Sequence, residues 1–341
     1  MNLIENLIQK LQRHPKRIVF PDGNDARVLQ AARRMVSLRM GVPIVIGDRS
    51  IIKEKAAKLD LATKGMRIIE PSRSADLDRL AGVLKSLPRF ADLEDSEALK
   101  IASEPNYFAT LMLHENQVEA IVSGATANAP SALRPLFQII GTQSSVKAAS
   151  SLLLLDMEEK KVGIDGAIFM GDCGVIPQPT VEQLADIALT TAGLARHLTN
   201  ARPKVAMLSY STHGNSKQEP VARVQEATRI AKQRAIEQQI EMDIEGDIQV
   251  DAALDQATAI VKGIQDSPVS GNANVLIFPD LNSGNIASKL VQILTGANKY
   301  GQIITGLNRP AAEISRGASA HEILGAAAIV GCQAIDRSLL R

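Results

Sequence analysis

The sequence has no tryptophan, few aromatic residues of any kind and only two cysteines. Aromatic residues make up 3% of its 341 residues, which argues against a groove that stacks bases or sugars on aromatic rings. The cysteines, Cys173 and Cys332, are too few and too far apart for a disulfide framework or a zinc site. The five histidines are scattered, so we expect no metal site.

An excess of charge of one sign is also missing. The chain has 38 Lys and Arg against 37 Asp and Glu, a formal net charge of +1, which leaves no basic footprint for nucleic acid. No stretch approaches the roughly 18 uninterrupted apolar residues of a membrane-spanning helix. The amphipathic helix predicted within residues 1–15 lacks the apolar core of a signal peptide. We therefore expect a cytoplasmic protein with neither nucleic-acid nor membrane partners.

Strand-like and helix-like segments alternate from the start of the chain. Residues 17–20 and 42–46 are short β-rich runs. Between them the pattern predicts a helix with Asn24 or Asp25 as its N-cap and Gly41 as its stop. With a third short strand expected soon afterwards, the order βαβαβ predicts an α/β fold with a parallel sheet.

Later apolar runs are typical of strands that are buried on both faces of a sheet. Each is followed by a polar loop that contains glycine, and in open α/β sheets ligands bind where strand carboxyl ends open into such loops. Five such loops predict an extended cleft. Besides 67–69, the predicted strands are 119–122, 166–170, 204–208, 273–278 and 302–305.

The common phosphate-binding and nucleophile motifs are absent, since the chain has no G-x-G-x-x-G, G-x-x-x-x-G-K-[ST] or G-x-S-x-G. Residues 123–128 (SGATAN) instead follow a predicted strand, and such a loop can present backbone N–H groups to an anion. Arg134 could add a bidentate clamp on a phosphate. The alternative is an ordinary turn with Arg134 on the surface.

Residues 314–322 (ISRGASAHE) open a helix. Ser319 and Glu322 have the spacing of a capping box, in which the glutamate side chain bonds to a backbone N–H. Ser315 and Arg316 would precede the helix N-terminus, where N–H groups and the helix dipole favour a phosphate or an oxyanion. The two interpretations are compatible, because a capped carboxylate beside a cleft can still accept a proton.

Taken together, these segments resemble the phosphate acetyltransferase and phosphate butyryltransferase family over nearly the whole chain. The resemblance rests on IVFPDGNDARVL, VSGA followed by LRPLFQII, VAMLSYSTHGNSK, GDIQVDAAL, SPVSGNANVLIFPDLNSGNIASKLVQ and ISRGAS. It implies reversible acetyl transfer between coenzyme A and inorganic phosphate through a ternary complex. It also implies a homodimer whose substrates are acetyl-CoA, phosphate and acetyl phosphate, with no permanently bound cofactor.

The resemblance further implies two α/β domains that flank a cleft, as in isocitrate and isopropylmalate dehydrogenases. The first domain would comprise residues 1–146 and 302–341, and the second residues 147–301. Strands from both ends of the chain would then contribute loops to one site.

The same resemblance assigns roles to individual residues. Ser315, Arg316 and Arg134 match the family's Ser-Arg pair and the arginine of its L-R-P motif, which bind acyl phosphate and stabilise the transition state. Glu322 stands where the family usually has an aspartate that acts as a base toward the coenzyme A thiol, and Ala318 where it often has a cysteine. The further substrate contacts that we expect are Ser123, Gly124, Thr126, Asn128, Lys85 (in place of an arginine), Gly174, Val175 and Tyr300.

Three other functions compete with acetyl transfer on this fold. A butyryltransferase or other acyl-chain variant would differ in pocket size, and one methylene changes discrimination by only about 1–3 kcal/mol. A dehydrogenase on the same fold would need a metal-binding aspartate cluster and a nicotinamide site, and the sequence displays neither. A regulatory module like the phosphotransacetylase-like part of some malic enzymes is disfavoured, because the Ser-Arg pair, Arg134 and an acid at position 322 are retained.

Overall fold

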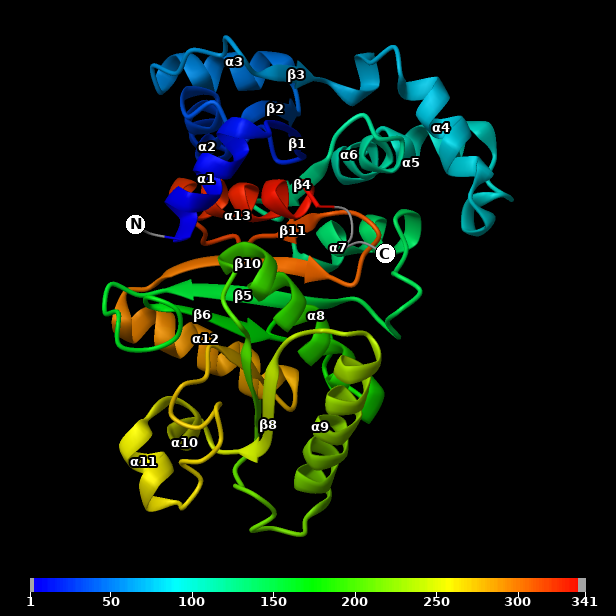
Figure 1. Ribbon diagram of the computed structural model, residues 1–341. Helices are drawn as coiled ribbons and strands as arrows, with labels where there is room; N and C mark the ends of the chain where they lie inside the picture. Colours follow the sequence, from blue (N-terminus) through cyan, green and yellow to red (C-terminus); the bar gives the residue numbers. More distant parts are fainter. Residues whose placement is uncertain (1–2, 337–341) are drawn as a thin grey trace. The chain divides into compact units, whose positions relative to one another are not determined.

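The computed structural model describes residues 3–336, in which helices and strands alternate (Figure 1). The chain forms two compact units, one of Met1–Gln143 with Leu307–Arg341 and one of Ser144–Gly306, called unit 1 and unit 2 below. A domain boundary at 301/302, as expected from the resemblance, would cut through β10 (Asn298–Thr305), which pairs with β5 (Ser150–Asp156) on both sides of that point. The two compact units divide after β10, between Gly306 and Leu307, and the domain boundaries implied by the resemblance stay a prediction.

Unit 1 is built on a parallel sheet with the strand order β3-β2-β1-β4-β11. The predicted strands at 17–20, 42–46 and 67–69 are confirmed, whereas β11 was not predicted. Gly41 begins β2 and does not cap α2, because Leu38 is the C-cap and Arg39 takes the left-handed turn with φ 55°. The strands are β1 (Lys16–Phe20), β2 (Gly41–Ile46), β3 (Arg67–Ile69), β4 (Ala120–Ser123) and β11 (Ala311–Glu313).

Helices of unit 1 cover its sheet with apolar faces, as in α1, where Ile4, Leu7 and Leu11 are buried and the helix packs against α13. The Asp25 carboxylate caps α2 by accepting the N–H of Arg27, so one of the two predicted caps is confirmed. The helices are α1 (Leu3–Arg13), α2 (Ala26–Ser37), α3 (Arg49–Lys58), α4 (Leu77–Ser86), α5 (Asp95–Ala102), α6 (Pro105–His114), α7 (Ala129–Ile139) and α13 (Ala320–Gln333), with 3₁₀ turns at Pro71–Arg73 and Pro88–Phe90.

Unit 2 has the strand order β10-β5-β6-β9-β7-β8. Its sheet is mixed, since β5 runs antiparallel to both β10 and β6, whereas β9 pairs in parallel with β6 and β7, and β7 pairs in parallel with β8. The other strands are β6 (Ala167–Gly171), β7 (Lys204–Leu208), β8 (Asp243–Ile248) and β9 (Val275–Ile277), and the helices are α8 (Val181–Thr199), α9 (Glu219–Glu237), α10 (Val250–Leu254), α11 (Gln256–Val261) and α12 (Leu281–Thr295).

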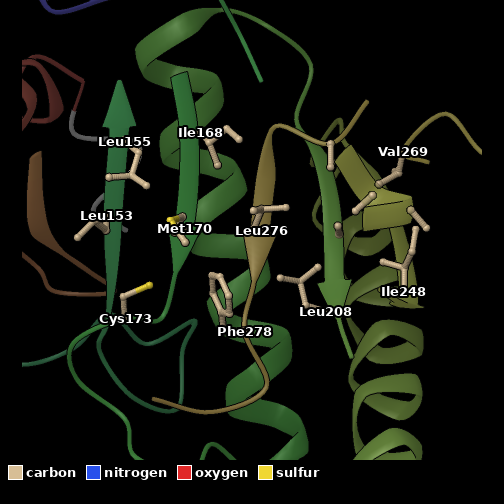
Figure 2. Close-up of a cluster of buried hydrophobic side chains, with 14 of the residues drawn as sticks. Leu153, Leu155, Ile168, Met170, Cys173, Leu208, Ile248, Val269, Leu276 and Phe278 are labelled. Carbon is tan, nitrogen blue, oxygen red and sulfur yellow. The ribbon is translucent and has the colours of Figure 1, made fainter. Parts of the chain in front are cut away.

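A core of aliphatic side chains lies on one face of this mixed sheet (Figure 2). Leu153 and Leu155 of β5, like Ile168 and Met170 of β6, are two residues apart, so their side chains share a face. Leu276 continues this row on β9. Among residues 3–336, no helix is both long and apolar enough to cross a membrane.

Candidate active site

Loops that follow β1, β4 and β11 meet at one end of the unit 1 sheet, because β1 and β11 both pair in parallel with β4. The Asp22 carboxylate, after β1, accepts the backbone N–H groups of Gly124 (2.9 Å), Ala125 (3.2 Å) and Thr126 (3.1 Å) and the Thr126 hydroxyl. We expected the N–H groups of the SGAT loop to bind a substrate anion, but those of Gly124, Ala125 and Thr126 donate to the buried Asp22 carboxylate.

Gly124 allows the loops after β4 and β11 to approach closely. Its φ is +106°, and a Cβ added there would lie 2.5 Å from the carbonyl oxygen of Ile314. The Ile314 N–H in turn donates to the Ser123 carbonyl at 2.7 Å. A residue without a side chain is thus required at the point where the two loops touch.

In the SGATAN segment, the Ser123 side chain is buried and the Asn128 side chain caps a helix. Ser123 is buried, and its hydroxyl oxygen has no hydrogen-bond partner among the residues that the structure describes. The Asn128 side-chain oxygen caps α7 by accepting the Ser131 N–H at 2.9 Å. Substrate contacts by these two side chains stay a prediction.

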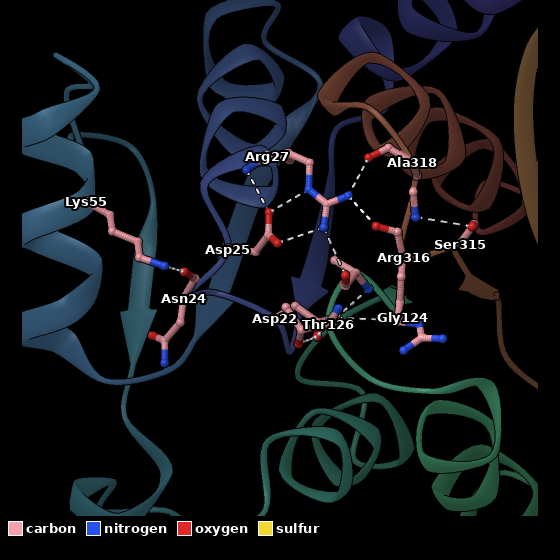
Figure 3. Close-up of polar contacts among 12 residues, drawn as sticks. Asp22, Asn24, Asp25, Arg27, Lys55, Gly124, Thr126, Ser315, Arg316 and Ala318 are labelled. Carbon is pink, nitrogen blue, oxygen red and sulfur yellow. Dashed lines mark hydrogen bonds and ion pairs between the residues drawn. The ribbon is translucent and has the colours of Figure 1, made fainter.

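Arg316 extends from the loop after β11 and is exposed, as are Ser315 and Gly317 beside it. The Ser315 hydroxyl accepts the Gly317 N–H at 3.3 Å. Within residues 3–336 the Arg316 guanidinium makes no hydrogen bond or ion pair, whereas the carbonyl oxygen of the same residue is held firmly (Figure 3). The loop therefore presents an unpaired positive charge next to the N-terminus of α13.

Arg134 is a second exposed arginine whose guanidinium has no hydrogen bond or ion pair in the described part of the chain. Its helix, α7, packs against β11, the strand that leads into the Arg316 loop. Burial and the nearby Glu104 raise the pKa of the Tyr107 hydroxyl, and the charge of Arg134 acts against that rise. Arg134 is thus within electrostatic reach of α6, on which Tyr107 lies.

The capping box predicted for Ser319 and Glu322 is confirmed. Glu322 is 8% exposed, its Oε2 accepts the Ser319 N–H at 2.7 Å, and its own N–H donates to the Ser319 hydroxyl at 3.2 Å. The carboxylate is thereby fixed at the first turn of α13, a few residues after the Ser-Arg pair.

The other predicted contacts are already engaged or buried. Lys85 forms an ion pair with Asp95 at 2.5 Å. In unit 2, the Gly174 and Val175 N–H groups donate to the Asp172 carboxylate at 2.9 and 3.1 Å, and Tyr300 is fully buried within β10. None of these arrangements shows a substrate contact, so the roles assigned to these four residues stay predictions.

Sequence reasoning missed the two residues that hold the loops together. The Asp22 carboxylate connects the loop after β1 to the SGAT loop. The Arg27 guanidinium connects the SGAT loop to the Arg316 loop (Figure 3). Both lie in the segment FPDGNDAR, which follows a predicted strand as the other polar loops do. Its position after a strand could have identified this segment as part of the site. Between residues 3 and 336, no group of three or more His, Cys, Asp and Glu side chains could hold a metal ion.

The chain is similar to known proteins along nearly its whole length. A family model described as phosphate acetyl/butaryl transferase matches residues 2–331. A phosphate acetyltransferase of Clostridium acetobutylicum is 38% identical over 98% of this chain and 99% of its own length. A solved phosphotransacetylase from Streptococcus pyogenes is 35% identical, covers 98% of both chains and superposes with a TM-score of 0.87. The EutD phosphotransacetylase from Staphylococcus aureus is 33% identical, with a TM-score of 0.86 over 97% of this chain and 98% of its own.

Proposed function

The chain belongs to the phosphate acetyl/butaryl transferase family, and we propose that its unpaired arginines, Arg134 and Arg316, bind the phosphoryl group in the reaction of that family. The protein is an acyltransferase that moves an acetyl group between coenzyme A and inorganic phosphate. The acyl-chain alternative is not favoured, because the similar curated proteins are phosphate acetyltransferases.

The observation that carries the assignment is the contrast among the arginines around the three loops. Arg27 is enclosed by oxygen acceptors, while the guanidinium groups of Arg134 and Arg316 make no hydrogen bond or ion pair in the described residues. An unpaired guanidinium matches the geometry of a phosphate bidentately. The pair can thus hold acetyl phosphate and offset the charge of the departing phosphate.

The remaining roles follow from the reaction. The coenzyme A thiol has an ordinary pKa near 8.5, so only a few per cent is thiolate at pH 7, and a positioned base typically contributes about 10²–10⁴-fold. Glu322 takes that role in our proposal. Thiolate attack on the acetyl carbonyl forms an oxyanion, which the Ser315 hydroxyl and Arg316 stabilise. Both substrates meet in one ternary complex, so no acyl-enzyme forms.

We place the protein in the cytoplasm and propose that it is a homodimer. Helix α12 exposes a row of large apolar side chains at i, i+4, i+7 and i+8, namely Ile286, Leu290, Ile293 and Leu294, each more than half exposed. The same row on a second copy would bury this face symmetrically. A single species with the mass of one chain, measured by light scattering at micromolar concentration, would contradict this assembly.

The phosphate-binding proposal is tested with Arg316→Lys and Arg134→Lys, because lysine keeps the charge and loses the planar fork. We expect each variant to lower kcat/KM for acetyl phosphate by at least about tenfold, the loss of roughly one charge-assisted hydrogen bond, with an unchanged melting curve. Arg49→Lys is the control, since Arg49 is likewise exposed and unpaired within the described residues but lies on α3. Wild-type rates in both test variants would refute the proposal.

A further inference from the structure

Arg27 lies at the start of α2 and is surrounded by oxygen atoms from three segments (Figure 3). Its Nε donates to Asp25 Oδ1 at 3.0 Å, and its Nη2 donates to Asp25 Oδ2 at 2.8 Å and to the Ala125 carbonyl at 2.9 Å. Its Nη1 donates to the carbonyls of Arg316 at 2.6 Å and Ala318 at 2.8 Å. One planar group thus joins α2, the SGAT loop and the Arg316 loop.

These contacts use the whole donor capacity of the side chain. A guanidinium has five N–H donors, and Arg27 makes five donor contacts to protein oxygens. The hydrogen bond and charge of Asp25 raise the pKa of Arg27, so the group stays positively charged. No donor is left over for a substrate, in contrast to Arg134 and Arg316.

The Arg27 side chain joins the backbone of the Arg316 loop to α2 by hydrogen bonds to two of its carbonyls. Within the loop itself, Ala318 N–H donates to the Ser315 carbonyl at 2.9 Å, and the Gly317 N–H donates to the Ser315 hydroxyl at 3.3 Å. Both are local contacts. Arg27 instead binds the peptide carbonyl of Arg316 and so restrains the backbone from which the Arg316 side chain extends.

We propose that Arg27 is a positioning residue, which sets the guanidinium of Arg316 for the phosphoryl group by clamping the Arg316 and Ala318 carbonyls to the SGAT loop. This rests on the proposed role of Arg316 in the site. Lysine cannot replace Arg27, because its three donors sit on one nitrogen and cannot span acceptors on three segments. A displacement of about 1 Å at a positioning group can cost about 10²-fold in rate.

The test is a double-mutant cycle with Arg27→Lys and Arg316→Lys, read as kcat/KM for acetyl phosphate beside the KM for coenzyme A. We expect Arg27→Lys to lower kcat/KM for acetyl phosphate by roughly 10–100-fold and to leave the KM for coenzyme A within about twofold. In the Arg316→Lys background the same change should cost less than about threefold, because residues that act through one another are not additive. Arg33→Lys, on the same helix with bonds to the carbonyls of Ala62 and Lys64, is the control and should match wild type.

The possible results separate this inference from the proposed function. The positioning role is overturned if the loss of kcat/KM in the double variant equals the product of the losses in the two single variants. It is also overturned if Arg27→Lys has unchanged kinetics while Arg316→Lys is impaired. Wild-type rates in Arg316→Lys refute the proposed function first. If Arg27→Lys does not fold, Asp25→Asn takes its place in the cycle, because asparagine keeps the N-cap of α2 while weakening the grip on the guanidinium. A rate unchanged by Asp25→Asn then overturns the inference.

Discussion

Replacing Glu322 separates its two roles, cap of α13 and proton acceptor, because glutamine can perform the first and not the second. Its Oε2 accepts the Ser319 N–H at 2.7 Å, and a glutamine oxygen can do the same. The chain already uses glutamine in this way, since in the capping box of α8 Gln183 accepts the Thr180 N–H at 2.9 Å. Glu322→Gln should therefore keep the cap.

The expected magnitudes differ by variant. Glu322→Gln gives up a negative charge near a helix N-terminus, a loss of about 0.3–1 kcal/mol. Glu322→Ala leaves the Ser319 N–H without its acceptor in a part-buried hydrogen bond. Loss of this cap costs on the order of 1 kcal/mol, or a few degrees of melting temperature for a unit of this size. If the carboxylate removes the thiol proton, both variants should lose about 10²–10⁴-fold in kcat.

The assay is kcat for thioester formation from acetyl phosphate and coenzyme A, with a melting curve for each variant. Glu97→Gln is the control, because Glu97 holds the same position in the capping box of α5. It should match wild type in kcat and lose only the same small stability as Glu322→Gln, about 0.3–1 kcal/mol. A fully active Glu322→Gln would show that the residue only caps the helix.

Three further outcomes follow from the structure. Gly124→Ala should lower the melting temperature and the activity together, because its Cβ would lie 2.5 Å from the Ile314 carbonyl oxygen at φ +106°; a variant with wild-type melting would contradict the contact. Burial raises the pKa of both thiols, that of Cys332 to about 12, so a disulfide reagent should label Cys173 and Cys332 only after denaturation; labelling of the native protein would refute this. Burial acts to raise the pKa of Asp25, but hydrogen bonds from its arginine partner outweigh it and lower that pKa, so the stabilisation is present at neutral pH and is lost as the pH falls through the folded pKa. Acid unfolding of Asp25→Asn, followed by circular dichroism, should therefore be less steep, and an unchanged profile would contradict the pairing.

Local sequence patterns predicted the elements that have strong local signals. The cap of α2, strands β1 to β3 and the capping box of α13 depend on residues close together in the chain, and all are found. Strand β11, with the sequence AAE, has no β-rich pattern of its own, and it is a strand because it pairs with β4. The antiparallel setting of β5 likewise depends on partners far along the chain.

The sequence could predict which types of residue form the site, but not which hydrogen-bond partners each of them has. Arg27, Arg134 and Arg316 all carry the same charge, and what distinguishes them is the set of acceptors that the fold brings to each guanidinium. The Asp22 carboxylate reaches a loop 102 residues away, to which no local pattern points. The sequence could thus identify the Ser-Arg pair, whereas the residues that hold it became visible only in three dimensions.

Exchange of labelled inorganic phosphate into acetyl phosphate tests most directly whether acetyl transfer occurs in one complex of both substrates. Direct attack by the thiol requires coenzyme A, whereas an acyl-enzyme on Ser315 would release and recapture phosphate without it. We predict no label in acetyl phosphate when coenzyme A is absent and rapid exchange when it is added. Exchange without coenzyme A at a rate comparable to turnover would contradict the account.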